Sequence, residues 1–240
     1  MSLTVHTKYS AEINDLINKN SSFGFLKYKS IPKKDINRWY MTNDKWDFDE
    51  EEVYISQVMF IGKTGYGKST TLNKIVGKDV FESSDVEVCT KDLYSAVYRI
   101  KGNEFFSLND LPGIGESNYA DNHYYDWYRD MLERSKCVVY VLRADQRDFA
   151  VDQILFKEMF KTYEQRKKVI FALNYADKIE PINRKTYLSK QQIKNLDRKV
   201  RDVANIFNVP YDEVIYYSAV DRININLLVN KICEKLKMDL

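Results

Sequence analysis

The eight residues from Gly62 to Ser69 constrain this chain more than any other stretch of it. They read GKTGYGKS and fill every fixed position of the phosphate-binding loop pattern G-x-x-x-x-G-K-[ST]. In that pattern the glycines let backbone N–H groups surround a phosphate chain, Lys68 reaches the outer phosphates, and the Ser69 hydroxyl binds Mg²⁺. A helix that starts at the end of the loop adds its dipole. The residues expected to line the phosphates of a nucleotide are Gly62, Lys63, Thr64, Gly65, Tyr66, Gly67, Lys68, Ser69 and Thr70.

The residues on both sides of this loop favour a phosphate site over an unliganded glycine turn. Residues 53–61 form a mostly apolar, β-branched and aromatic run, which is typical of a buried parallel strand. Residues 70–76 have helical spacing, and Gly77 is expected to end that helix. Strand, loop and helix therefore occur in the order that a phosphate-binding loop requires.

Composition excludes several other classes of protein. A length of 240 residues fits one globular domain with an appendage, and a net charge of +2 gives no reason to expect nucleic acid as the main partner. No apolar stretch approaches the roughly 18 residues that span a bilayer, and the first residues lack the layout of a secretory signal, so we expect a cytoplasmic protein without a membrane span. The chain has two histidines, and its three cysteines lie far apart, which argues against a transition-metal site. The cysteines are Cys89, Cys137 and Cys233.

The late position of the phosphate loop predicts two parts: an N-terminal extension at 1–52 and a nucleotide-binding domain at 53–240. A short amphipathic helix is expected at 11–18 within the extension. The extension also carries four aromatic residues, Trp39, Tyr40, Trp46 and Phe48. Because aromatic side chains are costly to leave in water, we favour packing of the extension on or near the core, with a partner-binding arm as the alternative.

Strand-like and helical segments alternate after residue 53, which predicts a layered α/β fold. Further strands are expected at 94–100, 104–109, 137–143, 168–173 and 213–217. Amphipathic helices are expected at 148–163, 190–206 and 225–236. The link at Gly102-Asn103 is too short for a crossover helix, so the strands on either side of it should form an antiparallel hairpin. The prediction is a three-layer sandwich around a mostly parallel six-stranded sheet with one antiparallel edge strand.

The string DLPG, from Asp110 to Gly113, ends one of the predicted strands. The Asp110 carboxylate suits the shell of a magnesium ion, acting through water, and the Gly113 N–H is placed to sense a γ-phosphate. A simple Pro-Gly turn is the alternative interpretation.

A second polar string, NYAD, ends the strand expected at 168–173 and contains Asn174 and Asp177. A carboxylate at Asp177 can accept hydrogen bonds from the ring N1–H and the exocyclic amine of guanine. Adenine offers no such pair of donors, so this residue would select GTP over ATP. After the last strand, Ser218 and Ala219 follow, and the Ala219 N–H is expected to reach guanine O6.

Taken together, GKTGYGKST, DLPG, NYAD and SA resemble in order and rough spacing the motifs of the Era-like branch of the translation-factor-related P-loop GTPases. The resemblance covers residues 53 to about 235 and implies GTP and GDP as ligands and Mg²⁺ as cofactor. Tyr175 stands where the family has a lysine whose stem covers the base, so reduced but guanine-selective binding is expected. The family also places a switch threonine on Mg²⁺. Thr90 matches it best, and a hydroxyl at the start of an edge strand is the alternative.

The resemblance implies in-line attack of water on the γ-phosphate, with Lys68, Thr90 and Gly113 in catalytic roles. Ile114 follows Gly113 where related enzymes supply a water-orienting glutamine, so hydrolysis should be slow until a protein effector or a nucleotide-dependent homodimer completes the site. Gly65 replaces the asparagine that some relatives use to recruit potassium, so potassium stimulation is not expected. Three arginines are candidates for an arginine finger, although each is more simply interpreted as a solvated surface residue: Arg129, Arg143 and Arg147.

An aromatic segment at 119–128 follows the second switch. It is expected to form a helix that buries Tyr124, Trp127 and Met131 and leaves Tyr125 and Tyr128 available for a nucleotide-dependent interface.

Two other functions share part of the pattern. One is a non-hydrolysing GTP-binding scaffold, suggested by Ile114 and Tyr175. The other is a P-loop small-molecule kinase, which would need an arginine-rich lid that the sequence does not show. Binding of RNA or the ribosome would follow from family analogy alone.

Overall fold

The computed structural model describes residues 4–6, 27–28, 38–42, 51–77, 79, 81, 94–101, 104–113, 128–129, 131–133, 135–182 and 187–236. Side chains are described from residue 56 onward within these ranges, apart from those of 94–105. Several predictions fall outside the described residues. They concern the helix at 11–18, the switch residue Thr90, the turn at Gly102-Asn103, Ile114, and the aromatic residues Tyr124, Tyr125 and Trp127.

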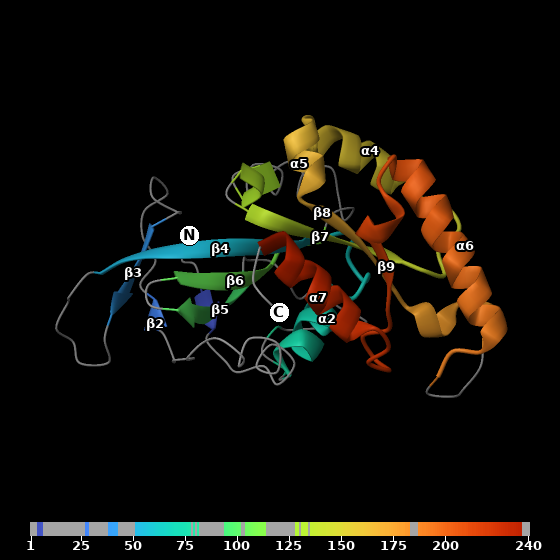
Figure 1. The fold of residues 1–240 in the computed structure, drawn as a ribbon, viewed down its shortest axis with the longest axis horizontal. Coiled ribbons are helices and arrows are strands. Elements are labelled where there is room, and N and C mark those ends of the chain that lie inside the picture. The colour runs from blue at the N-terminus through green and yellow to red at the C-terminus, as the bar shows by residue number, and fades with distance from the viewer. Residues whose placement is uncertain are drawn as a thin grey trace.

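One sheet organises the fold, with strands in the order β1-β5-β6-β4-β7-β8-β9 (Figure 1). Its central strands are β4 (Glu51–Ile61), β5 (Tyr94–Lys101), β6 (Glu104–Asp110), β7 (Ser135–Arg143), β8 (Val169–Asn174) and β9 (Val214–Tyr216). Three short strands precede them: β1 (Thr4–His6), β2 (Lys27–Tyr28) and β3 (Arg38–Thr42). β3 pairs with β4, and β2 pairs with β3.

The central six strands confirm the predicted sheet. β6, β4, β7, β8 and β9 run parallel, and β5 is antiparallel to β6, as the predicted hairpin requires. The prediction that the antiparallel strand lies at the edge is wrong, because β1 pairs with the outer side of β5. An open edge leaves a row of unpaired backbone groups, and pairing with β1 satisfies part of that row. β4 also begins two residues before the expected strand, since Glu51 pairs with Met41 of β3. The domain division at residue 52 stays a prediction.

Helices follow the strands with clear stop and start signals. The described helices are α2 (Lys68–Val76), α4 (Ala150–Met159), α5 (Tyr163–Lys167), η2 (Ala176–Lys178), α6 (Lys190–Phe207), η3 (Tyr211–Glu213) and α7 (Ile225–Leu236). Gly77 ends α2 with a φ of 74°, and its N–H donates to the Asn73 carbonyl. The single helix expected at 148–163 is wrong, because Thr162 forms a capping box with Gln165 and starts the separate helix α5.

Alternate residues of β4 face two hydrophobic layers. Val58 and Phe60 belong to a cluster with α2 and α7, whereas Met59 and Ile61 belong to a second cluster with α4 and α6. Figure 1 shows the same arrangement, with α2 and α7 on one side of the sheet and α4, α5 and α6 on the other. The predicted three-layer sandwich is therefore confirmed.

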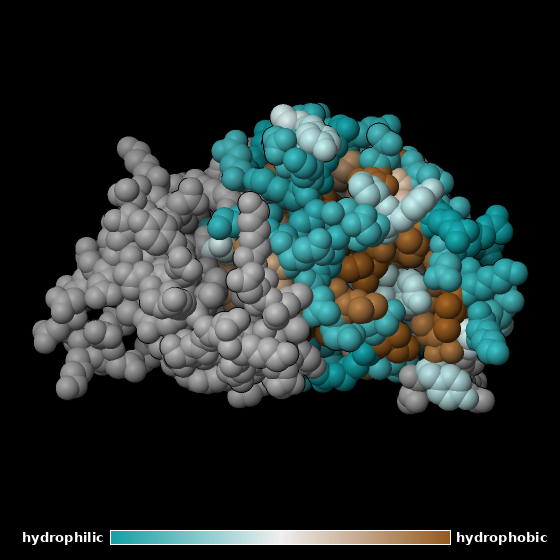
Figure 2. Space-filling model, in the orientation of Figure 1, coloured by the Kyte–Doolittle hydropathy of each residue, from teal (hydrophilic) through white to brown (hydrophobic). Residues whose placement is uncertain are grey.

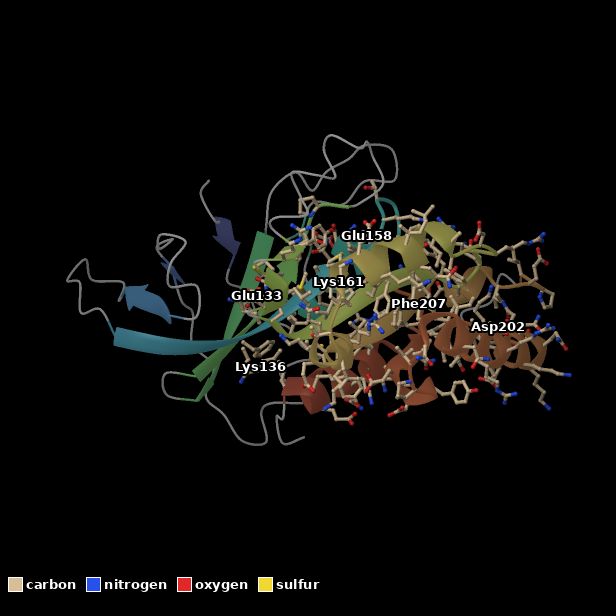
Figure 3. All side chains as sticks on the ribbon, turned by 90° about the horizontal axis from the view of Figure 1, so that it is seen from above. Glu133, Lys136, Glu158, Lys161, Asp202 and Phe207 are labelled. Atoms are coloured by element: carbon tan, nitrogen blue, oxygen red, sulfur yellow. The ribbon has the colours of Figure 1, made fainter. Side chains whose placement is uncertain are left out.

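The long helix α6 shows how a polar helix is anchored. Phe207, labelled in Figure 3, is buried and its ring lies 4.4 Å from that of Phe171 and 5.4 Å from that of Phe156, while Asp202 is exposed. The outward surfaces of α4 and α6 are mostly hydrophilic in Figure 2, and hydrophobic groups are visible between α6 and α7, where β9 lies. Among the helices of the described ranges, none combines the length and hydrophobicity needed to cross a membrane.

The apolar periodicity of the sequence predicted the buried face of α7 correctly but those of α4 and α6 only in part. All four apolar positions expected on α7 are buried, which confirms that face. On α4, Leu155 and Met159 are buried, but Val151 and Ile154 are more than half exposed, and Ile193 of α6 is 39% exposed. α4 is rotated so that Asp152 and Phe156 face inward instead.

Tyr128 corrects a further prediction. We expected it to be available for an interface, but its side chain is fully buried, and its hydroxyl donates to the Pro112 carbonyl. The ring packs in the hydrophobic cluster on the α4 and α6 side of the sheet, and the hydrogen bond supplies the partner that a buried tyrosine hydroxyl needs. Met131 is buried as expected.

Candidate nucleotide-binding site

The loop between β4 and α2 adopts a conformation that requires glycine at two positions. Gly67 has a φ of 83°, and a Cβ placed on it would collide with the Asn174 side-chain amide. Gly62 has a φ of 138°, and a Cβ there would collide with the Val141 carbonyl oxygen. Both residues combine a positive φ with close packing, so any L side chain would be strained at either position. The other predicted residues lie between the two glycines or in the first turn of α2. All nine predicted residues, 62–70, thus belong to one continuous loop-and-helix segment.

The Lys68 side chain lies back over this loop and is 6% exposed. Its Nζ donates to the carbonyl oxygens of Gly62 at 3.1 Å and Lys63 at 3.2 Å. The ammonium group is therefore held within the loop that the sequence assigns to phosphate.

Ser69 and Asp110 meet at the carboxyl ends of two neighbouring strands. The Ser69 hydroxyl donates to Asp110 Oδ2 at 2.6 Å, and Asp110 is fully buried. A hydroxyl and a carboxylate are oxygen ligands of the kind that Mg²⁺ prefers. The described residues thus fit a magnesium site, whose third expected residue, Thr90, lies outside the described ranges.

Gly113 packs directly against the phosphate loop. A Cβ at this position would lie 2.7 Å from both the N and the Cα of Thr64 and would collide with its hydroxyl. Only a glycine permits this approach, because real Cβ contacts are longer. The loop after β6 and the phosphate loop are therefore in backbone contact.

Asn174 joins the phosphate loop to the two strings that the sequence assigns to the base. Its Nδ2 donates to the Tyr66 carbonyl at 3.1 Å, and its Oδ1 accepts from the Ala219 N–H at 3.1 Å. The side chain is 3% exposed. Its bond with Ala219 is buried and its bond with Tyr66 is partly buried. The Ala219 N–H, expected to reach guanine O6, donates to Asn174 in this structure, and its role toward guanine stays a prediction. Ser218 is buried beside it, and its hydroxyl accepts from the Asp221 N–H.

Tyr217 supports the same junction and was missed from the sequence. It is fully buried, and its hydroxyl lies 2.8 Å from the Thr71 hydroxyl, which donates to the Gly67 carbonyl at 2.6 Å. Burial raises the pKa of Tyr217. No local pattern indicates this contact, because the two tyrosines at 216 and 217 are equivalent by composition.

Tyr175 bridges the base strings to the phosphate loop. It adopts a left-handed conformation with a φ of 62°, and its hydroxyl donates to the Gly65 carbonyl at 3.2 Å. The Arg143 guanidinium lies 4.2 Å from the centre of the Tyr175 ring. Arg143 also donates two hydrogen bonds to Asp145, at 3.0 and 2.8 Å, and this pairing raises its pKa. Arg143 is thus partly exposed, but it is held by these contacts, which the interpretation as a solvated surface residue did not include. Arg129 and Arg147 are exposed.

Asp177 lies in η2, directly after these residues, with 13% of its side chain exposed. Its carboxylate is 3.3 Å from Lys178 Nζ, and the Lys178 side chain is more than half exposed. An exposed lysine of this kind contributes little and can move away from the carboxylate. Asp177 is thus a mostly buried carboxylate in the short helix that follows Tyr175.

A partly buried ion pair connects the phosphate loop to α4. Lys63 Nζ lies 3.0 Å from Asp152 Oδ2, and the Asp152 side chain is fully buried in α4. Gln146 donates to Asp152 at 3.1 Å and accepts from the Tyr66 hydroxyl at 2.5 Å. Burial alone lowers the pKa of Lys63, but the hydrogen bond and charge of Asp152 outweigh it, so the pKa is raised. The variable positions of the loop pattern give no signal for these contacts.

A phosphate loop between a parallel strand and a helix, with a Ser–Asp pair at the next strand, defines a P-loop nucleotide-binding protein. A family model described as 50S ribosome-binding GTPase matches residues 57–175. Residues 57–175 therefore form a domain of this family, and the chain is an Era-like P-loop GTPase.

The uncharacterized protein YfjP of Escherichia coli (strain K12) is 34% identical over 148 residues, which cover 61% of this chain and 50% of the relative. This chain spans about half the length of that relative. Among solved structures, Era of Aquifex aeolicus bound to GDP·AlF4⁻ is similar with a TM-score of 0.62 and 22% identity, over 75% of this chain and 56% of Era. A structure of the chloroplast translocon components atToc33 and psToc159, whose dimerization is described as important for GTPase activity, has a TM-score of 0.54 and 20% identity, over 78% of this chain and 85% of that one.

Proposed function

We propose that this chain binds GTP, hydrolyses it slowly to GDP and phosphate, and acts as a nucleotide-dependent molecular switch. The observation that carries the proposal is the double hydrogen bond of Asn174, to the Tyr66 carbonyl and from the Ala219 N–H. This side chain holds the phosphate loop and the base strings together. The strings assigned to the phosphates and to the base are therefore in contact, which supports a single site with a phosphate end and a base end, as a nucleoside triphosphate requires.

At the phosphate end, the backbone N–H groups of the loop and the Lys68 ammonium supply positive charge. Ser69 and Asp110, with Thr90, would hold Mg²⁺, which when bound would neutralise phosphate charge. Support for this role is the 2.6 Å hydrogen bond that already brings the Ser69 hydroxyl and the Asp110 carboxylate together.

At the base end, the Asp177 carboxylate would accept the two donors of guanine and so exclude adenine. Support comes from its position beside Asn174 and from its partly exposed carboxylate, which is paired only weakly with Lys178 among the described residues. Guanine selectivity in this proposal rests on Asp177.

Hydrolysis would proceed by attack of a positioned water on the γ-phosphate. The Gly113 N–H would bind a γ-phosphate oxygen, and Lys68 would stabilise the charge that develops on the phosphate. The chain supplies Ile114 where a water-orienting glutamine is expected, so turnover alone should be about 10⁻⁴ to 10⁻² s⁻¹. Association with a second copy or a protein effector would then complete the site, in line with the dimerization described for the chloroplast relatives.

Single-turnover release of phosphate from GTP tests this proposal directly. We expect a slow rate with Mg²⁺ that rises with protein concentration, and no release by a Lys68→Ala variant under the same conditions. Tight GTP binding with no phosphate release at any concentration would instead indicate a GTP-binding scaffold. Binding of RNA or the ribosome rests on the family description, and a net charge of +2 gives it no independent support.

A further inference from the structure

The base end contains one unit that family motifs do not explain. Tyr175 replaces the lysine expected to cover the base, and its ring reaches from the end of β8 to the phosphate loop, where its hydroxyl donates to Gly65. The left-handed backbone at Tyr175 directs the side chain to this position. One end of the ring is therefore anchored by a hydrogen bond and the other by the backbone.

Arg143 covers one face of this ring. It ends β7 and is paired in register with Asn174, the residue before Tyr175. Its guanidinium carbon lies 4.2 Å from the ring centre, which is close contact for a cation over an aromatic face. Two parallel hydrogen bonds to Asp145 fix the plane of the guanidinium group.

An ion pair alone does not account for this arrangement. The side chains of Arg143 and Asp145 are 36% and 27% exposed, and partly exposed pairs contribute little to stability. The consequence of the geometry is instead that the Tyr175 ring is held in a fixed orientation, with Arg143 on one face and its edge attached to the loop that binds phosphate.

We propose that Arg143 is a positioning residue for guanine, which clamps Tyr175 so that the opposite face of the ring stacks on the base in place of the expected lysine. Arg143 also supplies, next to the Tyr175 ring, the positive charge that a lysine at position 175 would carry. The inference rests on the proposed GTP binding. Because stacking tolerates any base, it predicts a gain in affinity without a change in selectivity, which stays with Asp177.

Calorimetric titration with GDP and Mg²⁺ tests the clamp. Arg143→Ala should weaken GDP binding about 10-fold, whereas Arg198→Ala, which removes an exposed arginine from α6, should leave it unchanged. Arg143→Lys should show an intermediate loss, because lysine lacks the planar group that stacks. Binding of inorganic tripolyphosphate with Mg²⁺ should be the same in all these variants, which also reports that the phosphate loop is folded.

A second background separates clamping from a general structural role. Tyr175→Lys restores the family residue and removes the ring, so Arg143→Ala should then change GDP affinity less than about 2-fold. Three outcomes of Arg143→Ala would overturn the inference. GDP affinity could fall equally with Tyr175 and with Tyr175→Lys, tripolyphosphate binding could fall together with GDP binding, or GDP affinity could stay unchanged with Tyr175 present. Absence of GDP binding by the unaltered chain would overturn the proposed function as well, whereas normal GDP binding with an inert Arg143→Ala would overturn the clamp alone.

Discussion

The proposed phosphate end and the proposed base end of the site are built in different ways. The phosphate end is one short loop between β4 and α2, whose backbone conformation follows from its own glycines. The base end is assembled from the ends of β7 and β8, from η2 and from the turn after β9. The phosphate end is therefore specified by consecutive residues. At the base end, a change of residue type in one segment can be compensated by a residue from a neighbouring segment. Tyr175, which stands where the resemblance implies a lysine, lies at the assembled end.

The two ends are connected by Asn174, whose amide contacts the phosphate loop and the turn after β9. A substitution that does not touch Asn174 should therefore affect only the end in which it lies. A substitution that displaces Asn174 should affect both ends. The predictions below follow from that separation.

The largest effect is expected from Lys68→Ala. Removal of a buried ammonium that would pair with phosphate should cost about 4 kcal/mol of binding, or about 1000-fold in Kd, for GTP and GDP alike. Calorimetry measures the loss, and circular dichroism verifies the fold. A variant that retains GDP affinity within about 3-fold, which equals about 0.7 kcal/mol, would contradict the assignment of the phosphate end.

Asp177→Asn should act only at the base end. An amide keeps an acceptor for the guanine N1–H but places a donor against the exocyclic amine, so GTP binding should weaken about 100-fold. Xanthosine triphosphate carries a carbonyl in place of the exocyclic amine. It should therefore bind to the Asp177→Asn variant more tightly than to the unaltered chain. Competition between the two nucleotides measures the exchange, and an unchanged ratio would remove Asp177 from base recognition.

Gly67→Ala tests the connection between the two ends. Its Cβ would collide with the Asn174 amide, and the left-handed backbone adds strain. Gly65→Ala is a matched control, because Gly65 has a similar φ of 78° but a Cβ added to it would meet no atom within 4 Å. Chemical denaturation should show Gly67→Ala to be less stable than Gly65→Ala by about 1–3 kcal/mol. Equal stability would show that Asn174 is not tightly held.

The smallest effect concerns the pH dependence of stability. The folded pKa of Lys63 is raised above the ordinary value of 10.5, so its ion pair with Asp152 stabilises the fold fully below that pH. The contribution is lost as pH rises through the folded pKa. The difference in unfolding free energy between the unaltered chain and Lys63→Met should be constant near neutral pH and shrink above 10.5. A difference that grows with alkaline pH would contradict the sign of the shift.

The sequence predicted those parts of the molecule that depend on neighbouring residues. The strand–loop–helix unit, the hairpin of β5 and β6 and the buried face of α7 follow from local periodicity and turn chemistry. The pairing of β1 with β5 and the inward rotation of Asp152 depend on contacts between distant segments, so no local pattern indicates them. Tyr128 shows the same limit, since its burial is decided by a carbonyl sixteen residues away.

The candidate site divides in the same way. The residues of the phosphate loop, Ser69 and Asp110 were named from short strings, and the structure places them together. Arg143 was interpreted as a surface residue because nothing near it in sequence reveals the ring on which it lies. Contacts of this kind become visible only when β7 and β8 are placed side by side.

The central proposal is that one site joins the phosphate loop to a carboxylate that selects guanine. Titration of the unaltered chain with GDP and with ADP, both with Mg²⁺, measures it most directly. The account predicts a dissociation constant for GDP of about 1 μM or tighter, which corresponds to about 8 kcal/mol, and no detectable binding of ADP. Equal affinity for the two nucleotides would contradict it.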